Sequence, residues 1–176
     1  MEQVSVGTGF FVYDRPGHTR TVLESLKENR PAKLYVFADA PKEGRMRPEI
    51  EETRRLVRAI DWCPTEIVEH SRNLGTVDNL MFGIDHMMKH HDAVIVLEDD
   101  CALRTDSYMF MVRCLDFYKD DPRVFHVSGY QLPIRLDGPK PWDVYFSPLA
   151  MSWGWGTWKR SWKYFRLDVD LSLIHI

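Results

Sequence analysis

The sequence predicts an α/β fold in which helices cover a doubly wound, mostly parallel sheet. Short apolar segments typical of buried strands alternate along the chain with amphipathic segments of helical length. Strands separated by helix-length segments need parallel crossovers, and such crossovers build a doubly wound sheet. The 176 residues, 44% of them hydrophobic, suffice for one globular domain with a core of its own.

The first strand–helix unit lies near the N-terminus. Residues 4–12 form an apolar segment that ends at a DRPG turn, and residues 19–29 carry apolar side chains at helical spacing. Thr21 and Glu24 have the spacing of a capping box, which predicts that the helix begins close to them. This segment is therefore expected to be a strand followed by a helix.

A second unit and a third strand follow. Residues 33–41 predict a strand, residues 42–47 a polar loop, and Pro48 occupies a position favoured at the start of a helix. Residues 65–71 alternate apolar and polar side chains, as a strand does, and lead into the turn Arg-Asn-Leu-Gly. Apolar residues at helical spacing over residues 77–88 then predict the third helix.

The fourth strand is the most hydrophobic segment and ends in three acidic residues. Residues 93–97 are all apolar, and Glu98, Asp99 and Asp100 follow directly. From Thr105 onward the spacing of apolar side chains predicts a helix, and residues 124–130 predict a fifth strand.

Beyond Gln131 the pattern weakens into an irregular segment rich in aromatic residues. We therefore divide the chain into a ligand-binding core (1–131), the start of a second, substrate-facing region (132–166) and an irregular tail (167–176). Because an apolar end follows a charged segment without any terminal element, we expect this tail to be non-native and the chain to be truncated at its C-terminus.

Composition excludes several classes of partner. The net charge is −3 and the basic residues are scattered, so we expect no nucleic acid partner. The run at residues 93–97 is far shorter than the ~20 apolar residues that cross a bilayer, so we expect no membrane segment. The first residues lack the pattern of a secretory signal, which predicts a cytoplasmic protein. Three widely spaced cysteines suit reduced thiols in that compartment.

The acidic triplet is the strongest functional signal. In open α/β sheets, ligands bind outside the carboxyl ends of the strands, and Glu98, Asp99 and Asp100 fall at that edge. Neighbouring carboxylates repel one another unless a cation, water or hydrogen-bond donors compensate them. Mg²⁺ or Mn²⁺ commonly takes one or two carboxylates together with substrate phosphates. The triplet therefore predicts a metal that binds with a diphosphate, the alternative being a solvated loop or a helix cap.

Residues 93–131 resemble the nucleotide-sugar-binding core of the GT-A glycosyltransferases, most closely the branch of N-acetylglucosaminyltransferase I and its bacterial relatives. The shared pattern is an apolar strand, a DxD-like acidic triplet, a helix, an Asp-Pro pair and a Val-Ser-aromatic strand. A weaker resemblance extends over residues 4–166 and includes the Arg-Asn-Leu-Gly turn. The resemblance implies the GT-A fold, which is Rossmann-like.

The resemblance also assigns roles to the triplet. It implies that Asp100 is the direct ligand of a Mn²⁺ or Mg²⁺ ion that bridges the two phosphates of the donor. It further implies that Asp99 and Glu98 reach the ribose and the transferred sugar. The donor is expected to be a nucleotide sugar, with UDP as the favoured nucleotide.

Four further residues are assigned to the donor site by the same resemblance. Asp39 would read the edge of the nucleobase, Arg15 would lie near the nucleotide, and Arg72 and Asn73 would line the same pocket. Each has a structural alternative: Asp39 and Asn73 are residues that often hold turns, and the two arginines have the character of solvated or surface-paired side chains.

Trp153 and Trp155 are candidates for contact with the acceptor or the sugar. Together with Gly154 and Gly156 they offer flat apolar faces and N–H donors, with glycines that let a ligand approach the backbone. The alternative is that these tryptophans belong to the core.

The implied reaction is a transfer, inverting at the anomeric carbon, of the sugar to an acceptor hydroxyl. It needs a carboxylate base within reach of that hydroxyl. In the resembled branch this base lies downstream of the tryptophan-rich segment, so we expect it beyond the end of this chain. Asp168 and Asp170 are the last acids available, and their loop-like surroundings do not favour either as the base.

Two alternatives to a glycosyltransferase stay open at this point. A nucleotidylyltransferase shares the sheet architecture and the metal chemistry, but it typically has a glycine-rich basic loop after the first strand, where this chain has YDRPGHTR. A non-catalytic fragment that binds a nucleotide sugar or a metal is the second alternative, because the base is missing. A dehydrogenase is disfavoured, since no G-x-G-x-x-G follows the first strand.

Overall fold

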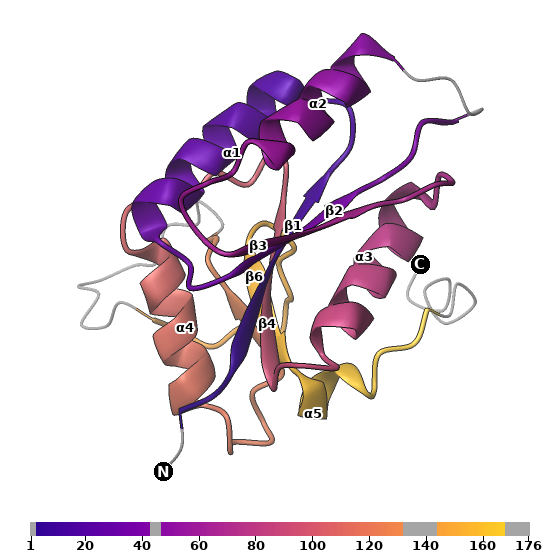
Figure 1. Cartoon of the computed structure of the whole chain (residues 1–176). Coiled ribbons are helices and arrows are strands. Elements are labelled where there is room, and N and C mark those ends of the chain that lie inside the picture. The colour runs from indigo at the N-terminus through magenta and orange to yellow at the C-terminus, as the bar shows by residue number, and fades with distance from the viewer. Residues whose placement is uncertain (1–2, 43–46, 132–143, 168–176) are drawn as a thin grey trace.

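The computed structural model describes residues 3–42, 47–131 and 144–167, which form one six-stranded sheet with helices on both faces (Figure 1). The strand order is β3-β2-β1-β4-β6-β5. The expected α/β class with a mostly parallel sheet is confirmed. Residues 132–143 and the tail with Asp168 and Asp170 lie outside the described residues.

Four strands form the parallel part of the sheet: β1 (Val6–Val12), β2 (Leu34–Ala38), β3 (Thr65–Glu69) and β4 (Ala93–Glu98). β1 lies in the centre and pairs in parallel with β2 on one side and with β4 on the other. β2 also pairs in parallel with β3, which forms the edge. After β1 the chain adds β2 and β3 on one side of it and then β4 on the other side. The strand order therefore reverses between β1 and β4, and this position is the topological switch point of the sheet.

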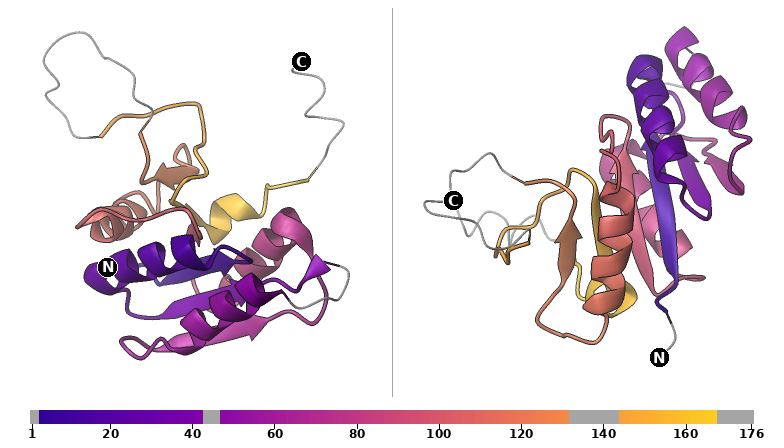
Figure 2. Two further views of the ribbon diagram at one scale, coloured as in Figure 1. Left: turned by 90° about the horizontal axis from the view of Figure 1, so that it is seen from above. Right: turned by 90° about the vertical axis from the view of Figure 1, so that its left-hand side faces the viewer.

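The helices cover the two faces unequally, as the turned views in Figure 2 show. One face of the sheet packs against α1 (Pro16–Asn29) and α4 (Ser107–Phe117), with α2 (Pro48–Arg58) beside α1. The other face packs against α3 (Gly75–Met87). Each strand of the centre is buried on both sides, which explains why β4 consists almost entirely of apolar residues.

Two separate apolar clusters result from this arrangement. On the α1 and α4 side, Phe10, Leu26 and Leu115 are fully buried. On the α3 side, Phe11 and Phe37 stack with ring centroids 4.9 Å apart, next to Ile84 and Met87. Phe10 and Phe11 thus serve opposite faces, as successive residues of a strand do.

The prediction of irregular structure after Gln131 is wrong for the tryptophan-rich segment. Strand β6 (Trp155–Trp158) lies antiparallel between β4 and β5 (His126–Ser128), and the short helix α5 (Lys159–Trp162) follows it. Trp158 is only 1% exposed, and its indole N–H donates a hydrogen bond to the Leu115 carbonyl. The segment therefore completes the sheet.

Two further boundaries differ from the sequence prediction. Helix α1 begins at Pro16 and not at the expected capping box, because Pro16 itself takes the first helical position. The Thr21 hydroxyl lies inside the helix and donates to the Gly17 carbonyl. The fifth strand contains only three residues of the seven predicted. In the described part of the chain, no helix combines the length and the apolar character needed to cross a membrane.

Candidate functional site

A cleft opens at the carboxyl ends of β1, β2 and β4, beside the start of α3. Thirteen residues line it: Phe11, Val12, Tyr13, Arg15, Asp39, Lys42, Asn73, Gly75, Thr76, Asn79, Leu80, Glu98 and Asp99. It therefore lies at the switch point between β1 and β4, where doubly wound sheets bind their ligands.

Asp39 holds one wall of this cleft together. It follows β2 and is 5% exposed, and its carboxylate accepts hydrogen bonds from the backbone N–H groups of Ala40 (2.8 Å), Leu74 (2.9 Å) and Gly75 (2.9 Å). It also accepts one from the Asn73 side-chain amide at 3.1 Å. Asp39 thereby caps the N-terminus of α3 from a distant strand, and both carboxylate oxygens are occupied. The expected role in reading a nucleobase stays a prediction.

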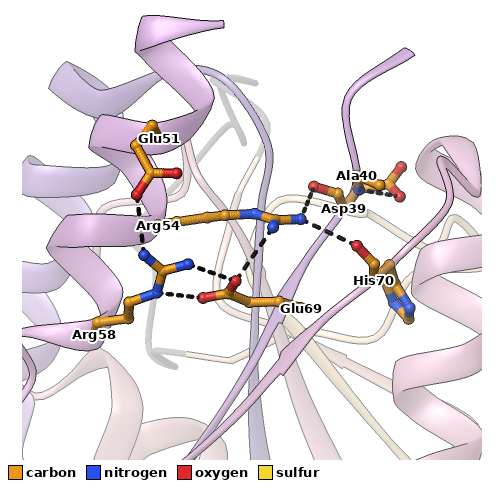
Figure 3. A network of polar contacts seen from close by, with 7 residues as sticks. All are labelled: Asp39, Ala40, Glu51, Arg54, Arg58, Glu69 and His70. Carbon is orange, nitrogen blue, oxygen red and sulfur yellow. Dashed lines mark hydrogen bonds and ion pairs between the residues drawn. The ribbon is translucent and has the colours of Figure 1, made fainter. Parts of the chain in front are cut away.

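Arg54, on α2, fastens the ends of β2 and β3 to each other (Figure 3). One of its terminal nitrogens donates to the backbone carbonyls of Asp39 (3.2 Å) and His70 (3.1 Å), and the other donates to Glu69 at 3.2 Å. The guanidinium is almost completely buried and supplies the hydrogen bonds that these two carbonyls would otherwise lack. It therefore fixes the backbone at the end of β2, where Asp39 lies, and at the end of β3.

Arg58 extends this network to the surface. It donates two hydrogen bonds of 2.7 Å to Glu69 and one of 3.0 Å to Glu51 (Figure 3). The hydrogen bonds from Arg58 are the main reason that the pKa of Glu69 is lowered. Glu69 therefore stays ionised and pairs with both arginines.

The acidic triplet provides the opposite wall. Asp99 is 3% exposed, and burial raises its pKa although Arg15 lies beside it. Glu98 is half-buried, and its pKa is raised by burial and by the charges of Asp100 and Asp99. The two carboxylates that line the cleft are therefore poorly compensated, and a further cation would stabilise their ionised forms.

Arg15 is the cation that already serves the triplet. Its guanidinium forms an ion pair with Asp99 and donates a hydrogen bond of 3.0 Å to Asp100. The Arg15 side chain is 45% exposed and the Asp100 side chain 42%, so solvent reaches the second contact. Burial of Arg15 would lower its pKa, but the two aspartates outweigh that effect and raise it.

Metal-binding capacity is limited in the residues that the structure describes. No group of three or more His, Cys, Asp or Glu side chains is arranged to hold a metal ion there. The exposed carboxylate of Asp100 fits a hard cation that takes most of its ligands from phosphates and water. A complete protein cage for a metal is not present in the described residues.

The structure brings most of the predicted donor-site residues together. Arg15, Asp39, Asn73, Glu98 and Asp99 line the same cleft, and Asp100 is joined to it through Arg15.

Three other candidates lie elsewhere. Arg72 is exposed and does not line the cleft. Trp155 belongs to β6 and stacks on His126 with ring centroids 5.1 Å apart, while Trp153 is exposed and meets Tyr130 edge-on at 4.7 Å. Their proposed contact with acceptor or sugar stays a prediction.

Several lining residues were not anticipated from the sequence. Tyr13 and Lys42 flank the ends of β1 and β2, and Asn79 faces the cleft from the second turn of α3. Asn79 is 5% exposed, which is unusual for an asparagine. No local pattern predicted this burial, because Asn79 directly precedes Leu80 and so lies about 100° around the helix from it, off the apolar stripe that Leu80, Ile84 and Met87 mark.

Comparison with known proteins identifies the fold. No protein-family model and no curated protein sequence matches the chain. Among solved structures, it is similar to mannosyltransferase PcManGT from Pyrobaculum calidifontis in complex with GDP-Man and Mn²⁺, with 18% identity and a TM-score of 0.52. It also aligns with 4-diphosphocytidyl-2C-methyl-D-erythritol synthase from Anaerococcus prevotii, at 10% identity and a TM-score of 0.49, over 96% of this chain and 83% of that one.

The first of these alignments defines the class of fold. It covers 73% of this chain and 36% of the mannosyltransferase, so this chain spans about a third of that protein. The chain therefore has a Rossmann-like α/β fold that is similar to the aligned part of this mannosyltransferase. Identity this low establishes the fold alone.

Proposed function

We propose that this chain is the donor-binding part of a metal-assisted, inverting glycosyltransferase of the N-acetylglucosaminyltransferase I-like branch. One observation carries the proposal: Arg15, Asp39, Asn73, Glu98 and Asp99, which come from four separate segments, line one cleft at the switch point of the sheet. This is where an α/β sheet holds a nucleotide.

The residues of the cleft suit a nucleoside diphosphate sugar. The planar guanidinium of Arg15 matches phosphate oxygens well and lies at the mouth of the acidic wall. Glu98 and Asp99 offer acceptors for the hydroxyl groups of a ribose or a sugar. Lys42 adds a second positive charge at the rim.

The proposed metal ligand is Asp100, with the donor's phosphates completing the coordination. A Mn²⁺ or Mg²⁺ ion bound there would offset the charge that develops on the leaving diphosphate. Since Arg15 now occupies the Asp100 carboxylate, an incoming cation has to compete with the guanidinium. A diphosphate that arrives with the ion gives Arg15 a new anionic partner, so metal and nucleotide should bind together.

The proposal is tested by calorimetric titration of UDP, with and without Mn²⁺, into the wild-type protein and Asp100→Ala. Asp61→Ala is the control, because Asp61 is an exposed aspartate away from the cleft. We expect Mn²⁺-dependent binding in the wild type and in the control, and its loss in Asp100→Ala. Equal binding by all three proteins, or no binding by a protein shown to be folded, would contradict the proposal.

Product analysis separates an enzyme from a binding module. The protein is incubated with a UDP-sugar that carries a radiolabel on the sugar, with Mn²⁺ and with an added acceptor. If the chain is an enzyme, the label should appear either on the acceptor or, after hydrolysis, in the free sugar. Binding without any product would favour the non-catalytic fragment.

A further inference from the structure

Helix α4 carries apolar side chains on a second face that the sheet does not cover. Tyr108, Met111 and Leu115 form its buried face and belong to the core. Met109 and Phe117 lie outside that face and are 44% and 78% exposed. A helix that is apolar on more than one face normally packs against a partner on each of them. The second face of α4 therefore points to a ligand or partner that covers it.

Two cavities along this second face form one groove. The first has a volume of about 690 Å³ and is lined by α4 from its first turn to its last. The second, of about 490 Å³, lies between α4, β5 and residues 144–151. Phe110, Cys114 and Val144 line both cavities, so the two adjoin, and we call them together the α4 groove. Since α4 has 11 residues and is roughly 16 Å long, the groove is elongated.

The walls of the α4 groove are mostly apolar. Aromatic and aliphatic side chains of α4, β5 and residues 144–151 make up most of its lining. Among the described residues, the charged side chains that line it are Asp106, Arg113 and Arg123. Arg123 is already paired with Asp121. A sugar buried in the groove would find few partners for its hydroxyl groups, whereas an extended apolar chain needs none.

The second cavity reaches the same edge of the sheet as the acidic triplet. Strands β4 and β5 run in the same direction, because each pairs antiparallel with β6. Val96 of β4 and Ser128 of β5 both pair with Trp155, so they lie at the same level. Tyr130 follows Ser128 and lines the cavity. The ends of β4 and β5 are two strand spacings, roughly 10 Å, apart. A ligand in the groove can therefore extend one end toward the triplet.

We propose that the α4 groove binds the apolar chain of an amphiphilic acceptor, whose hydroxyl-bearing head lies toward the triplet. This inference rests on the proposed function, which supplies the sugar donor. Tyr130 and Trp153 meet edge-on at 4.7 Å at the end of β5, where their rings offer a flat face to the head group. A chain in the groove also removes Met109 and Phe117 from water, which favours its binding.

The test is calorimetric titration of hexyl and octyl β-glucoside into the protein, with neither nucleotide nor metal present. Both probes are kept below the concentrations at which they form micelles. Each methylene group that the groove buries should tighten binding by about 4-fold. Octyl glucoside should therefore bind roughly 10-fold more tightly than hexyl glucoside.

Two variants locate the chain. Met109→Asp and Val144→Asp each place a carboxylate in the groove, at positions where the side chain is already 44% and 41% exposed, so both proteins should fold. Val77→Asp is the matched control, because Val77 is 48% exposed on α3 and does not line the groove. We expect the affinity ratio of the two glucosides to stay near about 10 in the control and to fall below about 3 in both variants.

The direction of the acceptor is tested with the donor nucleotide bound. Mn²⁺ is paramagnetic, so the ion bound with UDP should broaden the NMR signals of nearby protons. We expect stronger broadening for the glucose ring of bound octyl glucoside than for its terminal methyl group. The reverse order would overturn the inference and leave the proposed function standing.

The remaining outcomes separate the two claims. Equal affinity for the two glucosides, or the same ratio in the wild type and all three folded variants, would overturn the inference without touching the proposed function. A concentration-dependent dimer that Met109→Asp dissociates, without glucoside binding, would overturn it as well, because a second copy would then cover the groove. If UDP and Mn²⁺ do not bind to the folded protein, the proposed function fails and the acceptor role fails with it.

Discussion

Replacing Asp39 by asparagine should destabilise the fold by roughly 3–6 kcal/mol. The carboxylate now accepts four hydrogen bonds, from the N–H groups of Ala40, Leu74 and Gly75 and from the Asn73 amide. Asparagine has the same size but one oxygen, so two of these donors would face an NH₂ group. Hydrogen bonds to a charged acceptor contribute about 1.5–3 kcal/mol each, and two of them are lost.

Urea unfolding, followed by circular dichroism, measures this loss in Asp39→Asn and in the control Asp61→Asn. The control removes one exposed carboxylate and should change the free energy of unfolding by less than about 0.5 kcal/mol. The midpoint for Asp39→Asn should fall without a change in the slope. A loss below about 1 kcal/mol would refute the reasoning that Asp39 is the cap on which this wall of the cleft depends.

Three other predictions follow from single contacts. A Cβ at Gly83 would lie 2.4 Å from the Phe11 ring, so Gly83→Ala should lower the free energy of unfolding by about 1–3 kcal/mol. Urea unfolding measures this loss, and an unchanged midpoint would contradict the prediction. Arg54→Met leaves the carbonyls of Asp39 and His70 unpaired and should cost about 2–4 kcal/mol by the same measurement, whereas a stabilised variant would show that the network in Figure 3 is dispensable. Burial lowers the pKa of His91, so the unfolded chain binds a proton at a higher pH than the folded chain does. The free energy of unfolding should therefore fall as the pH drops below about 6.5, and it should fall less in His91→Gln. An equal fall in both proteins would exclude His91 as a cause.

The sheet could be predicted in large part because its central strands are buried on both faces. Such strands appear in the sequence as continuous apolar runs, and β4 is the clearest case. The helices between them show the periodicity of one buried stripe, which α2 illustrates with Ile50 and Val57. Local patterns of this kind are sufficient to give the element order and the parallel crossovers.

Strand β6 could not be predicted because its partners are distant in sequence. It has four residues, and it is held by antiparallel pairing with β4 and β5. Its glycine was interpreted as a point of ligand approach. In the structure a Cβ on Gly156 would lie 2.9 Å from the Val94 carbonyl oxygen, so glycine is needed there for the strands to pack.

The candidate site was predictable as a position but not as a set of contacts. The sequence located the acidic triplet and Asp39 at the carboxyl edge of the sheet, because strand ends can be read from local patterns. It did not reveal that Asp39 caps α3 or that Arg54 reaches it, since both contacts join residues that are far apart along the chain. Asn79 was overlooked for the same reason, because its burial depends on how α3 packs.

The strand order divides the cleft into two chemically different sides. The acidic triplet follows β4 on one side of β1, while Asp39 follows β2 on the other, and His70 follows β3 beyond it. Charge is therefore concentrated on the β4 side, where Arg15 meets Asp99 and Asp100, and Asn79 presents a neutral amide toward the β3 side through its bond to His70. A nucleoside diphosphate has the same polarity, with charged phosphates at one end and a neutral base at the other. On the proposed function, the phosphates lie toward β4, where a divalent cation together with Arg15 offsets the negative charge of the triplet, and the base lies toward α3.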